Sequence, residues 1–218
     1  PLIKNIIYSF QSFTLSSTTR EWVGLANYKQ LFSDKIILAC LKNNILYAVI
    51  SIIVQVGFGL VLAAVLEDTV FQKAAPFFRS VYFIPTVVSM TVVCLLFKFV
   101  YNPQMGLLNS FLQAVGLDNL TKIWLGSKKT AMYAVIAVSQ WQSTGYVTML
   151  FIVAIQKIPK DLYEAAEVDG AGKIKKFFYI TVPQVKQMFF VTMILTVVGA
   201  FTVFNEPYIL TGGGPGTA

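Results

Sequence analysis

The chain has 218 residues, of which 56% are hydrophobic and only 12% are charged, with a formal net charge of +7. A soluble domain of this size carries about twice that charged fraction, so the composition excludes an ordinary soluble domain and indicates a helical membrane protein. The absence of histidine removes the commonest proton shuttle and zinc ligand. The positive charge suits an anionic lipid surface or a nucleic acid, and the hydrophobic composition favours lipid and no nucleic acid.

Four apolar windows approach or exceed the length of about 20 residues that a helix needs to cross a membrane. They are Ile45 to Leu66 and the stretches between Arg79 and Lys98, Lys129 and Lys157, and Lys186 and Glu206. Leu2 to Phe10 resembles the tail of a further span, and no closing element follows the glycine-rich end. We therefore expect residues 1–218 to be a single transmembrane domain that is incomplete at both ends.

The polar connections alternate between the two sides of the predicted membrane. Residues 11–43 and 98–129 fall on one side, and residues 67–79 and 157–186 fall on the other. The two sides carry equal totals of positive charge, so the orientation depends on the concentration of lysines in 157–186. Because positively charged loops stay inside, we assign that loop to the cytoplasm. Its lysines are Lys157, Lys160, Lys173, Lys175, Lys176 and Lys186.

The loop 157–186 begins with a predicted helix. Pro159 suits a helix start, Asp161 complements the positive end of the helix dipole, and Gly170 and Gly172 are expected to end the helix. Small side chains on one face would let another backbone approach closely, which indicates docking. A solvated loop with ordinary helix caps is the alternative. The residues that recur on this face are Leu162, Ala165, Ala166 and Asp169.

A second amphipathic stretch follows the glycines. The pattern predicts a helix in the membrane interface, which Pro183 then redirects into the last span. The apolar face consists of Ile174, Phe177, Phe178, Thr181 and Val182, and the opposite face of Lys173, Lys175 and Lys176.

The stretch from Glu164 to Pro183 carries a specific spacing. It reads EAAEVDGAGKIKKFFYITVP and resembles the loop of permease subunits of binding-protein-dependent ABC importers, in the maltose, multiple-sugar and glycerol-phosphate branch. That loop reads E-A-A, three residues, G, nine residues, I, one residue, L-P, and Val182 here replaces the leucine. Weaker similarities are Val23-Gly24-Leu25 with Asn27-Tyr28, Phe78-Arg79 with Tyr82 and Pro85, and Leu210 to Pro215.

The resemblance implies an all-α membrane protein, a polytopic helical bundle of the type I ABC importer permease fold. Such a chain forms half of the pathway for a sugar or related polyol, beside a second permease subunit, two ATPase subunits and an extracytoplasmic solute-binding protein. ATP and Mg would be bound by the ATPases, so no cofactor is expected in this chain. It would be a multi-pass protein of the bacterial or archaeal cytoplasmic (inner) membrane. Residues 157–186 would be the coupling loop, with ATPase contacts from Glu164, Ala165, Ala166, Asp169, Gly170 and Ala171.

The middle of the third window is polar. A neutral polyol needs amides, hydroxyls and aromatic faces rather than a buried charge, so we expect this cluster to line the substrate path. Contacts between helices use the same residue types and are the alternative interpretation. The candidates are Gln140, Trp141, Gln142, Ser143, Thr144 and Tyr146, with Asn205 and Glu206 from the outer end of the next span.

Three other classes of protein are weaker interpretations. An ion-coupled secondary transporter usually has an ionisable group within its spans. The four windows contain none and Glu206 only borders one, although sodium could use backbone carbonyls. A structural scaffold would not need the polar cluster. An enzyme is least expected, because the sequence shows no nucleophile–base pair, metal cluster or cofactor loop, so we predict no catalytic residues and no metal site.

Overall fold

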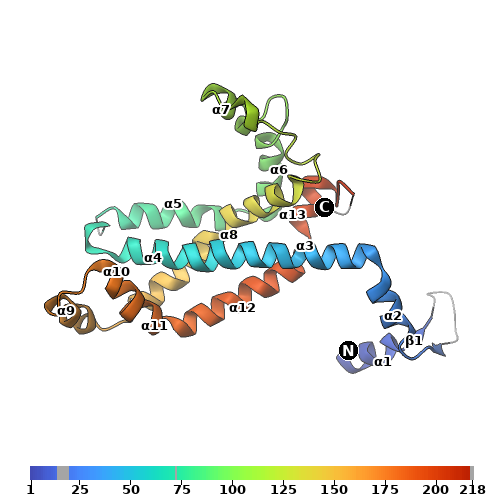
Figure 1. The fold of residues 1–218 in the computed structure, drawn as a ribbon, viewed down its shortest axis with the longest axis horizontal. Coiled ribbons are helices and arrows are strands. Elements are labelled where there is room, and N and C mark those ends of the chain that lie inside the picture. The colour runs from blue at the N-terminus through green and yellow to red at the C-terminus, as the bar shows by residue number, and fades with distance from the viewer. Residues whose placement is uncertain (14–19, 72, 217–218) are drawn as a thin grey trace.

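The computed structural model describes residues 1–13, 20–71 and 73–216. Parts of the predicted connections 11–43 and 67–79 therefore lie outside the described residues. The described chain is an elongated bundle whose long helices follow its longest axis (Figure 1). The only strands among the described residues are β1 (Gln11–Ser12) and β2 (Glu21–Trp22), which pair antiparallel. The predicted all-α class is confirmed.

The remaining elements follow in chain order. The first half contains α1 (Leu2–Ser9), α2 (Ala26–Ser33), α3 (Lys35–Ser51), the π-helix η1 (Ile52–Phe58), α4 (Gly59–Glu67), the 3-10 helix η2 (Thr69–Phe71), α5 (Ala75–Val87) and α6 (Met90–Val100). The second half contains α7 (Leu107–Ala114), the 3-10 helix η3 (Asp118–Leu120), α8 (Ala131–Ile155), α9 (Lys160–Val168), α10 (Lys173–Lys176), the π-helix η4 (Phe177–Thr181), α11 (Val182–Gln184), α12 (Lys186–Thr202) and α13 (Asn205–Thr211).

The first predicted window lies inside one continuous helix, Lys35–Glu67, formed by α3, η1 and α4. This helix starts well before the predicted Ile45, because Asp34 caps its N-terminus by accepting a hydrogen bond from the backbone N–H of Ile36 at 2.8 Å. By length and composition it is the one described helix able to cross a membrane by itself. Up to three such spans result if each of two sharply bent helix pairs counts as one.

The second predicted window is sharply bent. Helices α5 and α6 meet at 99° around Val88 and Ser89, so the window is not one straight helix. Pro85 lies buried within α5, before the break. The end of α5 is instead held by α8, because Thr86 Oγ1 donates to the carbonyl of Gln142 at 2.9 Å and Gln142 Nε2 donates to the carbonyl of Val88 at 3.1 Å.

The third window forms one helix, α8, as predicted. It is absent from the helices that are apolar enough to span a membrane, because its middle carries amide and hydroxyl side chains. The count of four apolar spans is therefore too high by this measure. Helix α8 nevertheless lies at the centre of the bundle, with buried residues along most of its length.

The last span is bent at its start. The segment Lys173–Gln184 meets α12 at 71°, so the predicted change of direction is confirmed, although it falls at Val185 rather than at Pro183. The predicted membrane-interface face of this segment stays a prediction. Thr181 is buried, whereas Ile174 is 75% exposed and Phe178 is 60% exposed, and exposed apolar side chains are free to contact lipid.

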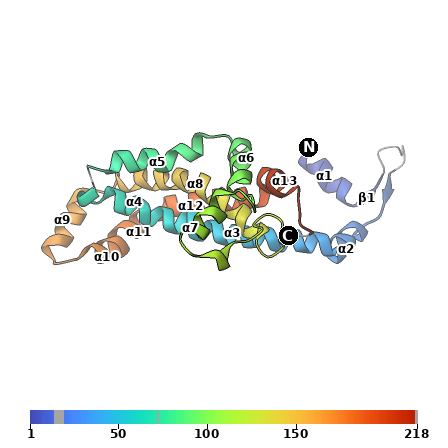
Figure 2. The same ribbon diagram turned by 90° about the horizontal axis from the view of Figure 1, so that it is seen from above.

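The turn between α4 and α5 and the segment α9 to α11 lie together at one end of the bundle, as predicted, and α1 and α2 lie at the opposite end (Figures 1 and 2). Helix α7 projects sideways nearer the middle of the bundle (Figure 1). Two buried apolar clusters divide the interior in the same way. Val135, Val138 and Cys94 belong to the cluster on the α7 side, and Val56, Phe151 and Val185 belong to the cluster nearer α9.

Candidate functional site

Helix α9 forms a short protrusion at the end of the bundle. Pro159 occupies its N-cap position, so the helix begins at Lys160, one residue after the predicted start. The helix ends as predicted, because Gly170 adopts φ +74° and the N–H groups of Gly170 and Ala171 bond to the carbonyls of Glu167 and Ala166 at 3.0 and 2.8 Å. Five of the six predicted contact residues are exposed or partly exposed on this protrusion, and Ala171 follows directly, partly exposed.

The inner side of α9 is fixed to the segment that follows it. Tyr163 and Thr181 share a hydrogen bond between their hydroxyl groups at 2.9 Å, and Thr181 is only 4% exposed. Lys176 in α10 pairs with Glu167 in α9. These two contacts hold α9 against the start of the last span, so the exposed face of α9 has a defined orientation.

Further polar contacts tie α9 and α10 to the end of the first span. Lys173 Nζ lies 2.8 Å from Asp68 Oδ2, just after α4. This hydrogen-bonded ammonium holds the pKa of Asp68 below its usual range, with help from the backbone N–H of Val70. Nearby, Glu67 pairs with Arg79 of α5 and accepts a hydrogen bond from Gln156 Nε2 at 3.2 Å. The two connections predicted to share one side are therefore in direct contact.

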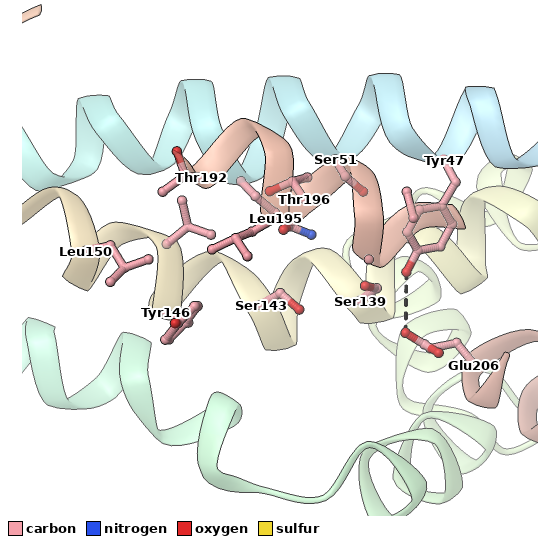
Figure 3. Close-up of a pocket in the computed structure, with 14 residues that line it drawn as sticks. Tyr47, Ser51, Ser139, Ser143, Tyr146, Leu150, Thr192, Leu195, Thr196 and Glu206 are labelled. Carbon is pink, nitrogen blue, oxygen red and sulfur yellow. Dashed lines mark hydrogen bonds between the residues drawn. The ribbon is translucent and has the colours of Figure 1, made fainter. Parts of the chain in front are cut away.

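A cavity of about 230 Å³ lies between the long helices, away from α9. Figure 3 shows polar side chains of α3, α8, α12 and α13 turned toward this space. Tyr47 Oη donates to Glu206 Oε1 at 3.4 Å, which joins α3 to α13. The lining residues are Tyr47, Ser51, Gln55, Ser139, Ser143, Tyr146, Val147, Leu150, Thr192, Leu195, Thr196, Gly199, Ala200 and Glu206.

The structure brings only part of the predicted substrate cluster to the cavity wall. Ser143, Tyr146 and Glu206 line it. Gln140 lies behind the wall, where its Nε2 donates to Ser51 Oγ at 3.0 Å and its Oε1 is buried without a partner. Thr144 is buried and donates to the carbonyl of Gln140 at 2.6 Å.

The other three predicted residues lie elsewhere. Trp141 is half exposed and its ring lies 5.3 Å from that of Phe97. Gln142 bonds to the end of α5, and Asn205 is exposed at the start of α13. A structural role in helix contacts thus describes Gln142 better than a place on the cavity wall.

Sequence reasoning missed the wall residues of α3, η1 and α12. Their signal was present, because Tyr47, Ser51 and Gln55 recur every four residues in an otherwise apolar span, as do Thr192 and Thr196. That spacing places polar groups on one face of a helix. The search for a single polar cluster in the third window overlooked these stripes.

Comparison with known proteins decides the family. Residues 36–217 match the family described as binding-protein-dependent transport system inner membrane component. The chain belongs to this family. Its relatives are permease proteins of ABC transporters, including sugar transporters, so it is the permease component of an ABC transporter of the sugar-transport group. As predicted, it is a membrane protein and not an enzyme.

Three relatives illustrate the family. The chain is 60% identical over 218 residues to the probable ABC transporter permease protein YurN of Bacillus subtilis, covering all of this chain and 75% of the relative. It is 33% identical to the sulfoquinovosyl glycerol transport system permease protein SmoG of Agrobacterium fabrum, and the match covers 100% of this chain and 70% of the relative. It is 32% identical to the trehalose/maltose transport system permease protein MalF of Thermococcus litoralis, and the match covers 91% of this chain and 66% of the relative.

Solved structures confirm the fold. A chain of a bacterial alginate ABC transporter, in complex with a periplasmic protein bound to an alginate pentasaccharide, superposes with a TM-score of 0.81. The two chains are 22% identical, and the match covers 99% of this chain and 72% of that one. The permease bundle predicted from the loop motif is therefore confirmed as the fold class.

Proposed function

We propose that this chain forms half of the translocation pathway for a sugar or related polyol. We also propose that α9 transmits to it the conformational change driven by ATP hydrolysis in a partner ATPase. The observation that carries the proposal is the pairing of two features in one chain. One is an exposed α9 that bears the Glu164-Ala165-Ala166 and Gly170 motif and is bonded to the following segment. The other is a half-open cavity between the long helices whose wall carries several hydroxyl and amide groups. The proposed partners are a second permease, two ATPase subunits that bind ATP and Mg, and an extracytoplasmic solute-binding protein.

The exposed face of α9 suits a cleft in another protein. Glu164 and Ala165 are exposed, and Tyr163 holds the opposite side of the helix to Thr181. A docked helix passes on displacement only if it is fixed to the spans, and the contacts of Lys173 with Asp68 and of Lys176 with Glu167 supply that attachment. We assign this end of the bundle to the cytoplasm, where its lysines would be retained.

The cavity suits a polyol. Hydroxyl groups of Ser51, Ser143 and Thr196 and the amide of Gln55 can exchange hydrogen bonds with sugar hydroxyls, while Leu150 and Leu195 supply apolar contact. These groups occupy three separate helices, so a change in helix positions would alter the site. Such a change is what transport by alternating access requires.

The experiment is purification of the tagged full-length protein in mild detergent, followed by identification of the proteins that copurify. We expect a second permease and an ATPase, and ATP hydrolysis that rises when a sugar-loaded binding protein is added. Recovery of the protein alone, together with transport in liposomes under an ion gradient without ATP, would overturn the proposal in favour of a secondary transporter.

A further inference from the structure

The cavity wall carries a single charged side chain, Glu206. Every other lining residue is uncharged, and most of the polar ones are hydroxyls. Glu206 is only 8% exposed, and its carboxylate points toward the Tyr47 hydroxyl in the space between α3, α8 and α13 (Figure 3). The wall therefore has a fixed place for negative charge.

No positive group of the described chain compensates Glu206. The ion pairs found among residues 1–13, 20–71 and 73–216 are Arg79 with Glu67, Lys173 with Asp68, and Lys176 with Glu167. All of them lie at the α9 end of the bundle. The bond from Tyr47 is long, at 3.4 Å, and a neutral hydroxyl contributes less to a carboxylate than a cation does.

A buried carboxylate is costly unless it is paired, and ionisable groups inside membrane bundles commonly mark substrate pathways. A neutral sugar would leave the charge of Glu206 without a counter-ion, and an anionic sugar would be repelled by it. A solute with an ammonium group would supply the missing positive charge while its hydroxyls bond to Ser139, Ser143 and Tyr47.

We propose that Glu206 is the counter-ion for a protonated amine of the transported solute, so that the pathway takes a sugar-like compound that carries an amino group. This inference rests on the proposed function, because it assumes that the cavity belongs to the substrate path. It adds a substrate class to that function and assigns Glu206 a role in selecting solutes by their charge.

The first test measures the charge preference of the cavity with defined reagents. In the complete importer with Cys40 and Cys94 replaced by serine, Ser143→Cys places a thiol in the wall. Its rates of reaction with a cationic ethylammonium and an anionic ethylsulfonate methanethiosulfonate are compared, with and without Glu206→Gln. We expect Glu206→Gln to lower the cation-to-anion rate ratio at least tenfold. Asp118→Asn, which removes an exposed charge outside the cavity, serves as the matched control.

An unchanged ratio in Glu206→Gln would overturn the proposal, because it would mean that the carboxylate is protonated or that the second permease already neutralises it. An equal drop in Asp118→Asn would overturn it as well, since the preference would then come from general surface charge.

The second test uses three derivatives of glucose. D-glucosamine, N-acetyl-D-glucosamine and D-glucuronate carry a positive, a neutral and a negative group, and each is tested for protecting Ser143→Cys from an uncharged maleimide. We expect glucosamine to protect at a concentration at least tenfold lower than N-acetylglucosamine, glucuronate to protect least, and Glu206→Gln to remove the difference. Equal or better protection by the neutral sugar, or protection by none of the three, would overturn the proposal.

The proposed function can survive these failures. If binding protein still stimulates ATP hydrolysis and the importer still requires ATP, the transporter assignment stands and only the amine is excluded. If both activities are absent from the wild-type complex, the proposed function itself fails.

Discussion

The α9 end of the molecule and the region around the cavity are stabilised by different kinds of contact. At the α9 end, ion pairs and a hydroxyl–hydroxyl bond connect α4, α5, α9, α10 and η4. Around the cavity, polar side chains mostly bond within their own helix, as Thr192 does with the carbonyl of Met188 at 2.9 Å. The bonds that cross between helices there include the long one from Tyr47 to Glu206, the one from Gln140 to Ser51 and a contact between the hydroxyls of Tyr47 and Ser139.

This difference suits the two tasks that we propose. A region that passes on displacement needs contacts that keep its parts in fixed positions, whereas a region that binds and releases a solute must change shape at low cost. The α9 end has more fixed contacts between its elements, and the cavity wall has fewer. The first variant disturbs the packing of α5 against α8, which connects the two regions. The next variants change the surface of α9, and the last ones remove individual contacts that hold α9.

The largest effect is expected from Gly145→Ala, which disturbs the packing of α8 against α5. A Cβ at Gly145 would overlap the carbonyl oxygen of Tyr82, because α5 and α8 pack backbone to backbone at this point. Overpacking of this kind costs about 1–3 kcal/mol or more, so we expect a lower unfolding temperature and poor recovery from membranes. In Gly57→Ala the new Cβ meets only the Ile52 carbonyl oxygen at 3.8 Å, and this control should behave as wild type. Equal stability of the two variants would contradict the close packing.

A large loss of coupling is expected from Gly170→Leu and Glu164→Lys. Gly170 has φ +74°, a conformation that costs other residues about 1–2 kcal/mol, and both substitutions change the α9 surface that we assign to the ATPase contact. We expect uptake to fall at least tenfold while the protein still inserts, measured as transport by reconstituted importer beside its ATP hydrolysis. Gly24→Leu, at φ +57° in open space, has a similar backbone cost at the other end and should retain coupling. Normal uptake by both α9 variants would refute the coupling assignment.

A smaller effect is expected from Tyr163→Phe, which removes one contact beneath α9. The partner hydroxyl of Thr181 is buried, and loss of one such hydrogen bond costs about 1 kcal/mol. We expect more ATP to be hydrolysed per solute imported, because α9 is held less firmly. Tyr179→Phe removes an exposed hydroxyl, on a residue that is 81% exposed, and is the matched control. A change confined to Tyr179→Phe would contradict this account.

The smallest effect is expected from breaking the contact between Lys173 and Asp68. The Lys173 side chain is 65% exposed, so the pair contributes about 0.2–1 kcal/mol. Because the pKa of Asp68 is lowered in the folded protein, this contribution is present above the ordinary value of 3.8 and is lost as pH falls through the depressed value. A double-mutant cycle of Asp68→Asn and Lys173→Met, measured by thermal unfolding at pH 7, gives the coupling energy.

Two controls sharpen that measurement. Lys175→Met removes a neighbouring lysine that forms none of the described ion pairs and should show no coupling to Asp68→Asn. High salt should reduce the coupling of Lys173 to Asp68, since the pair is exposed to solvent. Zero coupling at low salt would show that this contact does not help to hold α9.

The sequence predicted best what depends on local chemistry. Helix α9 and its end at Gly170 follow from a proline, a run of helix-forming residues and a glycine, all within a short stretch. The 99° break between α5 and α6 was not predicted, because Pro85 lies inside α5 and the break follows it at Val88 and Ser89. The contacts of Thr86 and Val88 with Gln142 secure the end of α5, and their pairing is set by tertiary structure.

The cavity was only partly predictable for the same reason. The middle of α8 was recognisable from its polar composition, and Ser143 and Tyr146 do line the wall. Which face of α8 turns inward depends on α3 and α12, whose own polar stripes complete the wall. Glu206 follows α12 in the sequence and reaches the cavity because α13 folds back toward α3.

The most direct test of the central claim is a cross-link from the exposed face of α9. Ala165→Cys, in the complete importer lacking Cys40 and Cys94, is treated with a short bifunctional thiol reagent, and the products are separated by mass. The account predicts a covalent adduct with the ATPase subunit, and none from Gln113→Cys, which is exposed on α7, a helix that lies away from α9 (Figure 1). An intact, transporting complex in which Ala165→Cys gives no adduct with the ATPase would contradict it.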